Sequence, residues 1–169
     1  MSRAPWVLPK PDRAFPAGDI SAPSTTLGWR LINPAMPAEW TVSLGEANEQ
    51  LEDRHRVGRE RMDAFAMRSH RLADEAWNAG FFDDLTTAVP GTDLARDENI
   101  RAGTPAEKMA ALKPVFRTGG TITAGNASPL SDGASAVLLG SESAAQVIAC
   151  DPVARIAGRA AYALEPQFF

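Results

Sequence analysis

The side chains able to perform covalent or metal chemistry are few and widely spaced in this chain. Cys150 is its single cysteine, and its two histidines are His55 and His70. A reactive thiol needs a neighbouring base or cation, whereas Asp151 beside Cys150 would raise the pKa of the thiol. Two histidines far apart in sequence are not a credible metal site. We therefore predict no catalytic residue and no metal ligand, and we expect His70 to pack or to donate or accept a hydrogen bond.

A glycine-rich segment runs from Gly119 to Gly133, with the sequence GGTITAGNASPLSDG. Its spacing matches neither GxGxxG nor GxxxxGK[ST], the two common phosphate-binding patterns. Glycines between a strand and a turn let a ligand approach the backbone closely. They suit a tight turn at the edge of a sheet equally well, so the pattern alone leaves both interpretations open.

A second candidate for ligand binding is an arginine-rich face of the helix predicted over residues 58–79. Its members are Arg59, Arg61, Arg68 and Arg71. Such a face could meet the phosphates of a nucleotide. Acidic residues are interspersed among the arginines, however, and this mixture is more typical of a solvated surface.

Composition excludes several classes of protein. The chain has 169 residues, 44% of them hydrophobic, which is enough for one domain with a core. A net charge of −4 without a long basic run argues against sequence-independent binding to nucleic acid. The apolar stretch Ala134 to Leu139 is too short to cross a bilayer, and the first residues lack the apolar stretch of a signal peptide. We expect a cytoplasmic protein without a membrane or nucleic-acid partner.

The elements that must position any site differ along the chain. Residues 1–40 hold seven prolines and three tryptophans, so we expect an irregular loop that packs against other parts of the protein. The helical period begins at Leu44 and is strongest from residue 58 to residue 79, where Gly80 would end the helix. A short helix is predicted from Thr104, and Pro114 limits its far end.

After residue 119 the pattern favours strands. Residues 121–123 are β-branched, residues 134–140 and 153–163 read as buried strands, and residues 141–149 read as a helix between them. Strand, helix and strand form a βαβ unit of a parallel sheet, so the predicted fold class is α/β. The chain then divides into a helical, loop-rich part, residues 1–118 (irregular 1–40, helical 44–116), and a sheet fragment, residues 119–169. Because two strands do not make a stable parallel sheet, we expect the sequence to be truncated at its end.

Several segments resemble one family in the same order and spacing. TITAGNASPLSDGASA, residues 121–136, resembles the thiolase stretch TVTAGNASxLNDGAAA. DENIRAGTPAEKMA and the following ALKPVF resemble DExxRxxTTxExLA and its sequel, and RERMDAFAMRSHRLADEAWNAGFF resembles RxxQDxFAxxSHxxAxxA. The resemblance runs from the first residues to about Pro166. It implies a partial thiolase-like fold, in which a loop domain is followed by a piece of a mixed sheet.

The resemblance also implies an activity. Thiolases transfer an acyl group between an enzyme cysteine and CoA, by thiolysis of a 3-ketoacyl-CoA or by Claisen condensation of acyl-CoAs, as in fatty acid metabolism. The family's catalytic cysteines, its histidine and its asparagine fall outside these residues, and Cys150 matches none of them. This chain alone is therefore predicted to be inactive, as part of a parent that forms a homodimer or homotetramer. The alternative is a non-catalytic module that binds acyl-CoA or lipid.

The resemblance assigns CoA-binding roles to six residues, namely Arg101, Lys108, Phe116, Ala124, Gly125 and Ser128. Arg101 corresponds to an arginine near the nucleotide end of CoA, and Phe116 to a residue packed along it. Ala124, Gly125 and Ser128 correspond to the lining of the pantetheine path, with Ser128 as the side chain that forms hydrogen bonds.

Two positions depart from the family pattern. Lys108 stands where several members have a serine near the adenine, so it either pairs with the ribose phosphate or is solvated. Leu44 replaces a methionine of the acyl pocket. The stretch STTLGWRLINPAM, residues 24–36, is similar to thiolases of the β-ketoadipyl or broad 3-ketoacyl type.

Overall fold

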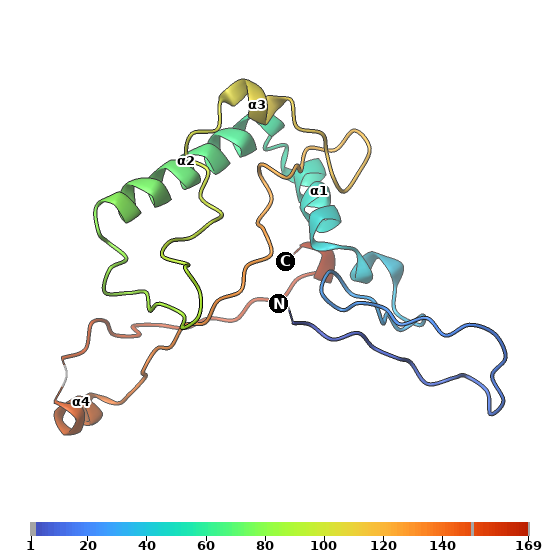
Figure 1. Ribbon diagram of the computed structural model, residues 1–169, viewed down its shortest axis with the longest axis horizontal. Helices are drawn as coiled ribbons and strands as arrows, with labels where there is room; N and C mark the ends of the chain where they lie inside the picture. The colour runs from blue at the N-terminus through green and yellow to red at the C-terminus, as the bar shows by residue number, and fades with distance from the viewer. Residues whose placement is uncertain (1–2, 150, 169) are drawn as a thin grey trace.

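The computed structural model describes residues 3–149 and 151–168. Its elements in chain order are η1 (Ala38–Thr41), α1 (Leu44–His55), α2 (Arg59–Asn78), α3 (Ala106–Ala110), α4 (Glu142–Ile148) and η2 (Pro166–Phe168). Figure 1 shows α1, α2 and α3 grouped together, with long loops leaving this group and with α4 apart from α1 and α3. None of the helices in the described part of the chain is long and apolar enough to span a membrane.

The α1–α2 pair begins and ends at local signals. The hydroxyl of Ser43 caps α1 by accepting the N–H of Glu46 at 3.2 Å. At the other end Arg56 takes a left-handed conformation, with φ of 52°, and its N–H donates to the carbonyl of Glu52. Gly58 follows with φ of 85°, a conformation that glycine adopts without strain, and α2 starts at the next residue. The helix predicted over residues 58–79 is confirmed.

Helical structure is less extensive than the sequence predicted for residues 44–116. After α2, Gly80 has φ of 75°, and residues 79–105 form turns and loops. The short third helix begins at Ala106 rather than at Thr104. The reason is local, because the hydroxyl of Thr104 donates to the carbonyl of Arg101 at 3.0 Å and does not cap the helix.

A small core lies where α1, α2 and α3 meet residues 120–127. Its buried apolar side chains are Ala47, Met109 and Ile122. Three polar residues are buried beside them, namely Glu49, Asp63 and Thr123. Because buried polar groups need partners, their hydrogen bonds determine how residues 120–127 dock on the helices.

The predicted βαβ unit is not formed in the described residues. The helix between the expected strands is present as α4, but residues 134–140 and 153–163 run as exposed, unpaired chain, with Val137 81% exposed. Only two isolated antiparallel bridges occur in the described part, Trp6 with Ser24 and Pro114 with Thr123. A parallel strand needs neighbours on its edges and layers on its faces, and nothing in these residues supplies either. The mixed sheet therefore stays a prediction.

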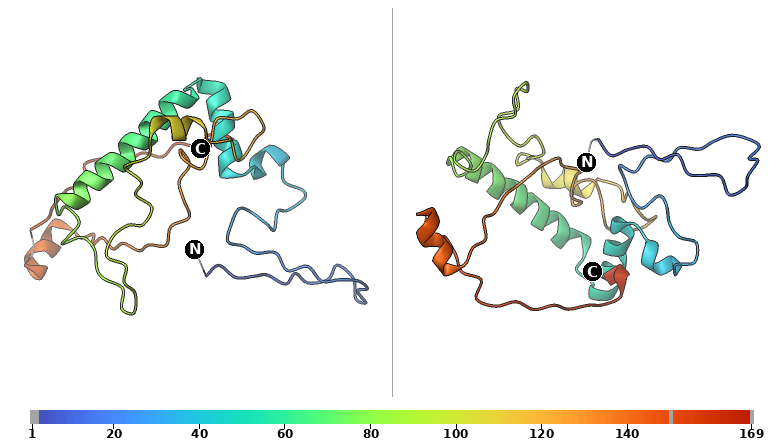
Figure 2. Two further views of the ribbon diagram at one scale, coloured as in Figure 1. Left: turned by 45° about the horizontal axis from the view of Figure 1, so that its top comes forward. Right: turned by 90° about the horizontal axis from the view of Figure 1, so that it is seen from below.

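The N-terminal segment is irregular, as its prolines predicted, but it does not pack as expected. Trp6, Trp29 and Trp40 are all exposed. Two backbone hydrogen bonds hold its ends together, from Val7 N–H to Pro23 O at 3.1 Å and from Thr25 N–H to Pro5 O at 3.2 Å. Figure 2 shows the resulting excursion of the first residues reaching away from the helices.

Candidate functional site

A cavity of about 470 Å³ lies between α2 and the segment of residues 125–129. The wall on the α2 side consists of Val57, Arg61, Met62, Phe65, Ala66, Ser69 and His70. The opposite wall consists of Gly125, Asn126, Ala127, Ser128 and Pro129. This volume is in the range of small-molecule sites, which are typically about 300–1,000 Å³.

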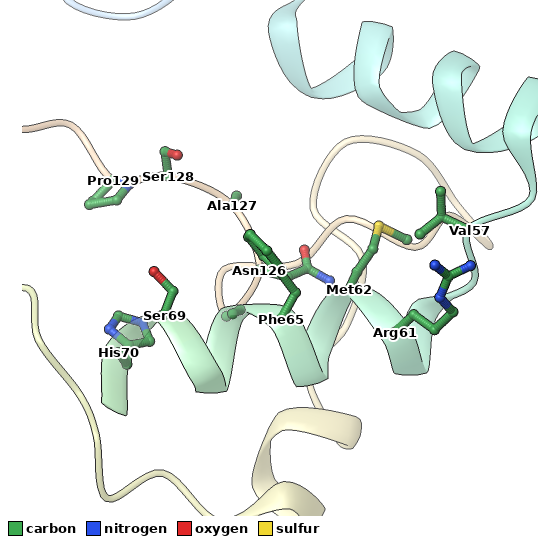
Figure 3. Close-up of a pocket in the computed structure, with 12 residues that line it drawn as sticks. Val57, Arg61, Met62, Phe65, Ser69, His70, Asn126, Ala127, Ser128 and Pro129 are labelled. Atoms are coloured by element: carbon green, nitrogen blue, oxygen red, sulfur yellow. The ribbon is translucent and has the colours of Figure 1, made fainter. Parts of the chain in front are cut away.

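The α2 wall follows from helical spacing. Met62, Phe65 and Ser69 recur at intervals of three and four, so their side chains share one face of the helix. Figure 3 shows Ser69 and His70 at the end of the cavity near Ser128, with Arg61 at the opposite end. The α2 wall is therefore polar at its two ends and apolar between them.

The opposite wall is a tight turn. The carbonyl of Thr123 accepts the N–H of Asn126 at 3.3 Å and that of Ala127 at 3.0 Å. Gly125 lies directly on the third helix, since an added Cβ would be 2.6 Å from Cδ1 of Leu112 and 2.7 Å from Sδ of Met109. A larger residue would require the ends of the Leu112 and Met109 side chains to shift, so the end of α3 supports the turn from behind.

Glu49 of α1 anchors the start of this turn. Its side chain is 2% exposed, and its carboxylate accepts the N–H of Thr121 at 2.9 Å, the N–H of Ile122 at 2.8 Å and the hydroxyl of Thr121 at 3.0 Å. Three donors compensate for taking the carboxylate out of water. An added Cβ at Gly120 would be 2.3 Å from Oε1 of Glu49, so the glycine makes room for the carboxylate.

Asp63 of α2 anchors the middle of the turn. It is 7% exposed, and its Oδ1 accepts a hydrogen bond from Nδ2 of Asn126 at 2.9 Å. Its Oδ2 pairs with Nε of Arg59 at 2.7 Å. Both anchoring carboxylates thus come from helices and are satisfied by specific donors.

An ion-pair cluster joins α1 to the segment before the turn. Arg117 reaches Glu46 through Nη2 at 2.5 Å and Nε at 3.2 Å, and it reaches Asp53 through Nη1 at 2.6 Å. The hydrogen bond from Arg117 lowers the pKa of Glu46 below its ordinary value of 4.5. The same two acidic partners raise the pKa of Arg117. Arg117 is therefore held on α1, next to Phe116.

Comparison with known proteins assigns this arrangement to a family. Residues 28–143 match the sequence profile of the thiolase N-terminal domain. The chain belongs to the thiolase family. It is 38% identical to the beta-ketoadipyl-CoA thiolase of Pseudomonas aeruginosa over 174 aligned residues, which cover 99% of this chain and 43% of that protein. It is 42% identical to the 3-ketoacyl-CoA thiolase of Shewanella sediminis over 82% of this chain and 34% of that protein.

Solved thiolase structures share the fold of this chain. Human mitochondrial 3-ketoacyl-CoA thiolase in complex with CoA matches it with a TM-score of 0.73 and 30% identity, over 89% of this chain and 38% of that one. The acetyl-CoA acetyltransferase of Bacillus anthracis matches it with a TM-score of 0.69 and 33% identity, over 88% and 38%. This thiolase chain therefore has a partial thiolase fold, and it spans less than half the length of the relatives it matches.

The structure brings only some of the predicted site residues together. Gly125 and Ser128 line the cavity. Arg101 lies beside its polar end, since the N–H of Arg101 donates to Nδ1 of His70 at 3.3 Å. Lys108 lies on α3 and Ala124 in the turn, both exposed, and of the residues that the structure describes neither is part of the cavity lining.

Phe116 and Leu44 form a separate group at the start of α1. The ring of Phe116 lies on Gly45, where an added Cβ would be 2.2 Å from the ring. Leu44 is the adjacent residue, and both side chains are exposed. Neither Phe116, predicted to pack along CoA, nor Leu44, predicted for the acyl pocket, is among the residues that line the described cavity.

The sequence did not identify the α2 wall as part of the site. Met62, Phe65 and Ser69 were visible as an apolar stripe, which predicts burial and does not predict a cavity. The expectation that His70 packs or hydrogen-bonds is confirmed by its bond to Arg101. The sequence held no clear signal for this wall, because the stripe continues past Ser69 to Leu72 and Ala76 as an ordinary packing face would.

The metal and thiol predictions concern different parts of the chain. Within residues 3–149 and 151–168, no group of three or more histidine, cysteine, aspartate or glutamate side chains is placed to hold a metal ion. Cys150, interpreted from the sequence as structural or incidental, lies outside the described residues.

Proposed function

We propose that this chain is the CoA-binding part of a thiolase-type acyltransferase. The observation that carries the proposal is the cavity lined by Gly125 and Ser128 of the TAGNAS turn, beside Arg101. Family membership supports the acyl-transfer chemistry, and the names of the relatives, beta-ketoadipyl-CoA thiolase and 3-ketoacyl-CoA thiolase, point to a 3-ketoacyl-CoA as substrate.

The proposed orientation of CoA follows from its chemistry. Its phosphates face two exposed cations, Arg101 beside His70 at one end of the cavity and Lys108 on α3. The amphipathic pantetheine arm runs along the turn, where the hydroxyl of Ser128 meets one of its amides. Phe116 and Leu44 lie further along the path, on the acyl side.

The chemical step is assigned to the full-length parent. A cysteine thioester forms and is attacked by CoA in thiolysis, or by an acyl-CoA enolate in condensation, with an acid–base pair moving the protons. We propose that those groups lie outside these 169 residues, so that this chain binds CoA without turnover. We also propose that residues 134–140 and 153–163 become strands of the mixed sheet in the parent, which would be a cytoplasmic homodimer or homotetramer.

A free-standing acyl-CoA or lipid-binding module is the second candidate, and the exposed apolar surface disfavours it. Val137, Leu138 and Leu139 are consecutive and all largely exposed. Monomeric soluble proteins rarely leave such patches uncovered. These residues fit a chain whose partners belong to the same parent better than they fit an independent carrier.

Calorimetric titration of the purified chain with CoA tests the proposal. We expect saturable binding that weakens about tenfold in Ser128→Ala, because one hydrogen bond of roughly 0.5–1.5 kcal/mol is lost. Ser131→Ala is the matched control, since Ser131 is exposed and lies outside the cavity lining. Absence of CoA binding would overturn the proposed function, and turnover of 3-ketoacyl-CoA by the pure chain would overturn the claim that it lacks the catalytic groups.

The full-length parent offers a second test, through Arg101→Ala. A residue that contacts only the phosphates should raise KM for CoA and leave kcat nearly unchanged. Arg68→Ala on the exposed side of α2 serves as the control. A fall in kcat with an unchanged KM would show that Arg101 is not a binding residue.

A further inference from the structure

A continuous path of polar side chains connects the three elements around the cavity. Arg59 donates through Nη2 to the carbonyls of Met109 at 2.7 Å and Leu112 at 3.2 Å, at the end of α3. Its Nε pairs with Asp63 of α2, whose other oxygen accepts Nδ2 of Asn126 in the turn. The third helix, α2 and the turn are therefore linked through one buried carboxylate.

The side chain of Asn126 connects parts of the turn through hydrogen bonds. Its Oδ1 accepts the N–H of Thr123 at 2.8 Å, while Nδ2 donates to Asp63 and to the carbonyl of Thr121 at 3.1 Å. A carboxylate can only accept, so Asp63 determines which way the amide faces. In that orientation, Oδ1 of Asn126 faces the backbone N–H of Thr123, from which it accepts a hydrogen bond.

The hydrogen-bonded pair of Asp63 and Asn126 lies at the wall of the cavity. Asn126 itself lines the cavity, with Gly125 on one side and Ala127 and Ser128 on the other. Asp63 follows Met62, a residue of the opposite wall. The pair therefore fixes the distance between the two walls as well as the backbone of the turn.

We infer that Asp63 and Asn126 are a positioning pair that presents the Gly125–Ser128 edge to CoA, an inference that rests on the proposed function. Neither side chain needs to touch the ligand. The pair holds this edge in place because a hydrogen bond to a charged partner is short and directional. Moving the groups that contact a ligand by about 1 Å costs much of the binding affinity.

Reversal of the hydrogen-bond polarity separates positioning from simple stabilisation. In Asp63→Asn, one amide N–H₂ must face either Arg59 or Asn126, both donors. In Asn126→Asp, two carboxylates face each other. The double variant Asp63→Asn/Asn126→Asp restores a donor facing an acceptor between residues 63 and 126, and it leaves Arg59 facing the amide oxygen, although the carbonyl of Thr121 loses its donor.

The experiment measures CoA affinity and melting temperature for the same set of purified chains. We expect each single variant to weaken CoA binding about tenfold or more, and the double variant to recover to within about threefold of the natural chain. Asp74→Asn is the matched control, because Asp74 lies on the same helix, pairs with Arg96 and is not part of the cavity lining. It should bind CoA as the natural chain does.

Three results would overturn the inference, and they differ in whether the proposed function survives. Unchanged CoA affinity in the folded single variants, with only the melting temperature lowered, would show a purely structural pair while leaving the proposed function intact. A double variant as weak as the worse single variant would show that side-chain polarity does not set the edge. Failure of the natural chain to bind CoA would remove the proposed function and this inference together.

Discussion

At the scale of single residues, the buried carboxylate of Glu49 accepts backbone hydrogen bonds that a neighbouring strand would accept in a sheet. Glu49 accepts the backbone N–H groups of residues 121 and 122, and no strand among the described residues is placed to accept them. An unmade hydrogen bond inside a protein costs more than a made one contributes. The side chain is therefore essential for docking this segment on α1.

Glu49→Gln should lower the free energy of unfolding by about 2 kcal/mol, because an amide group would replace one acceptor oxygen with a donor facing N–H groups. Urea unfolding followed by circular dichroism measures the change. Glu60→Gln, an exposed position on α2, should stay within about 0.5 kcal/mol of the natural chain. Equal effects of the two substitutions would contradict the role given to Glu49.

A second prediction at the residue scale concerns Gly45, because the ring of Phe116 lies against it. Gly45→Ala would place a methyl group 2.2 Å from the ring, so the ring must move. We expect a destabilisation of about 1–3 kcal/mol despite the higher helix propensity of alanine. Thermal unfolding compares it with Gly103→Ala, where an added Cβ meets nothing within 4 Å and no comparable loss is expected.

At the scale of elements, the ion-pair cluster of Arg117 connects α1 to the segment that leads into the turn. This cluster could not be predicted from the sequence, because its partners Glu46 and Asp53 lie far from Arg117 along the chain. Exposed ion pairs contribute little, but Arg117 engages Glu46 with two nitrogens, and both side chains are about one-third exposed or less.

The lowered pKa of Glu46 predicts how stability depends on pH. The pKa of its carboxyl group lies below the ordinary value of 4.5 in the folded chain, so the unfolded chain binds the proton first as the pH falls. The contribution is therefore complete at neutral pH and is lost as the pH drops below 4.5 through the folded pKa. Melting temperatures from pH 7 to pH 3 should fall more steeply for the natural chain than for Glu46→Gln.

A highly exposed ion pair supplies the control for that series. Glu142 and Arg155 are 3.4 Å apart and are almost fully solvated. Glu142→Gln should follow the natural chain at every pH, because solvent screens such pairs. A Glu46→Gln profile parallel to the natural one would refute the assignment.

Elements that depend on residues close in sequence could be predicted, and elements that depend on residues far along the chain could not. The α1 and α2 helices follow from their own apolar period and from Gly58 and Gly80. The strands expected at residues 134–140 and 153–163 depend on neighbours that these residues do not provide. Within the site, Gly125 and Ser128 were found through a family pattern, whereas Asp63 depends on Asn126, which is 63 positions away.

At the scale of the whole molecule, order is concentrated in the three-helix group and in the turn docked on it. The remaining chain is extended, and η2 returns to α1, where the guanidinium of Arg54 lies 4.9 Å from the ring centroid of Phe168. Segments with few buried contacts open at low free-energy cost. The two parts should therefore differ sharply in local stability.

Limited proteolysis with thermolysin, which cleaves before large apolar residues, should show that difference. The first cuts should fall at Val137 to Leu139 and near Val153 and Ile156, which are all exposed. Sites within α1 and α2 should be cut much later, and mass spectrometry of the early fragments identifies each cut. Early cleavage inside α2, with residues 137–156 protected, would contradict the structure or reveal an assembly that covers them.

The separation of the two anchors from the turn has a consequence for the order of folding. Glu49 and Thr121 are 72 residues apart in the chain, so closing that loop costs about 4 kcal/mol of entropy before any anchor bond is made. The α1–α2 pair has only local contacts to form and should appear first, with its carboxylates still hydrated. During synthesis on a ribosome, these helices would wait until residue 126 had emerged before the turn could dock. Within the ordered group, the cavity would therefore form after α1 and α2, and it would be lost before these helices when the group unfolds.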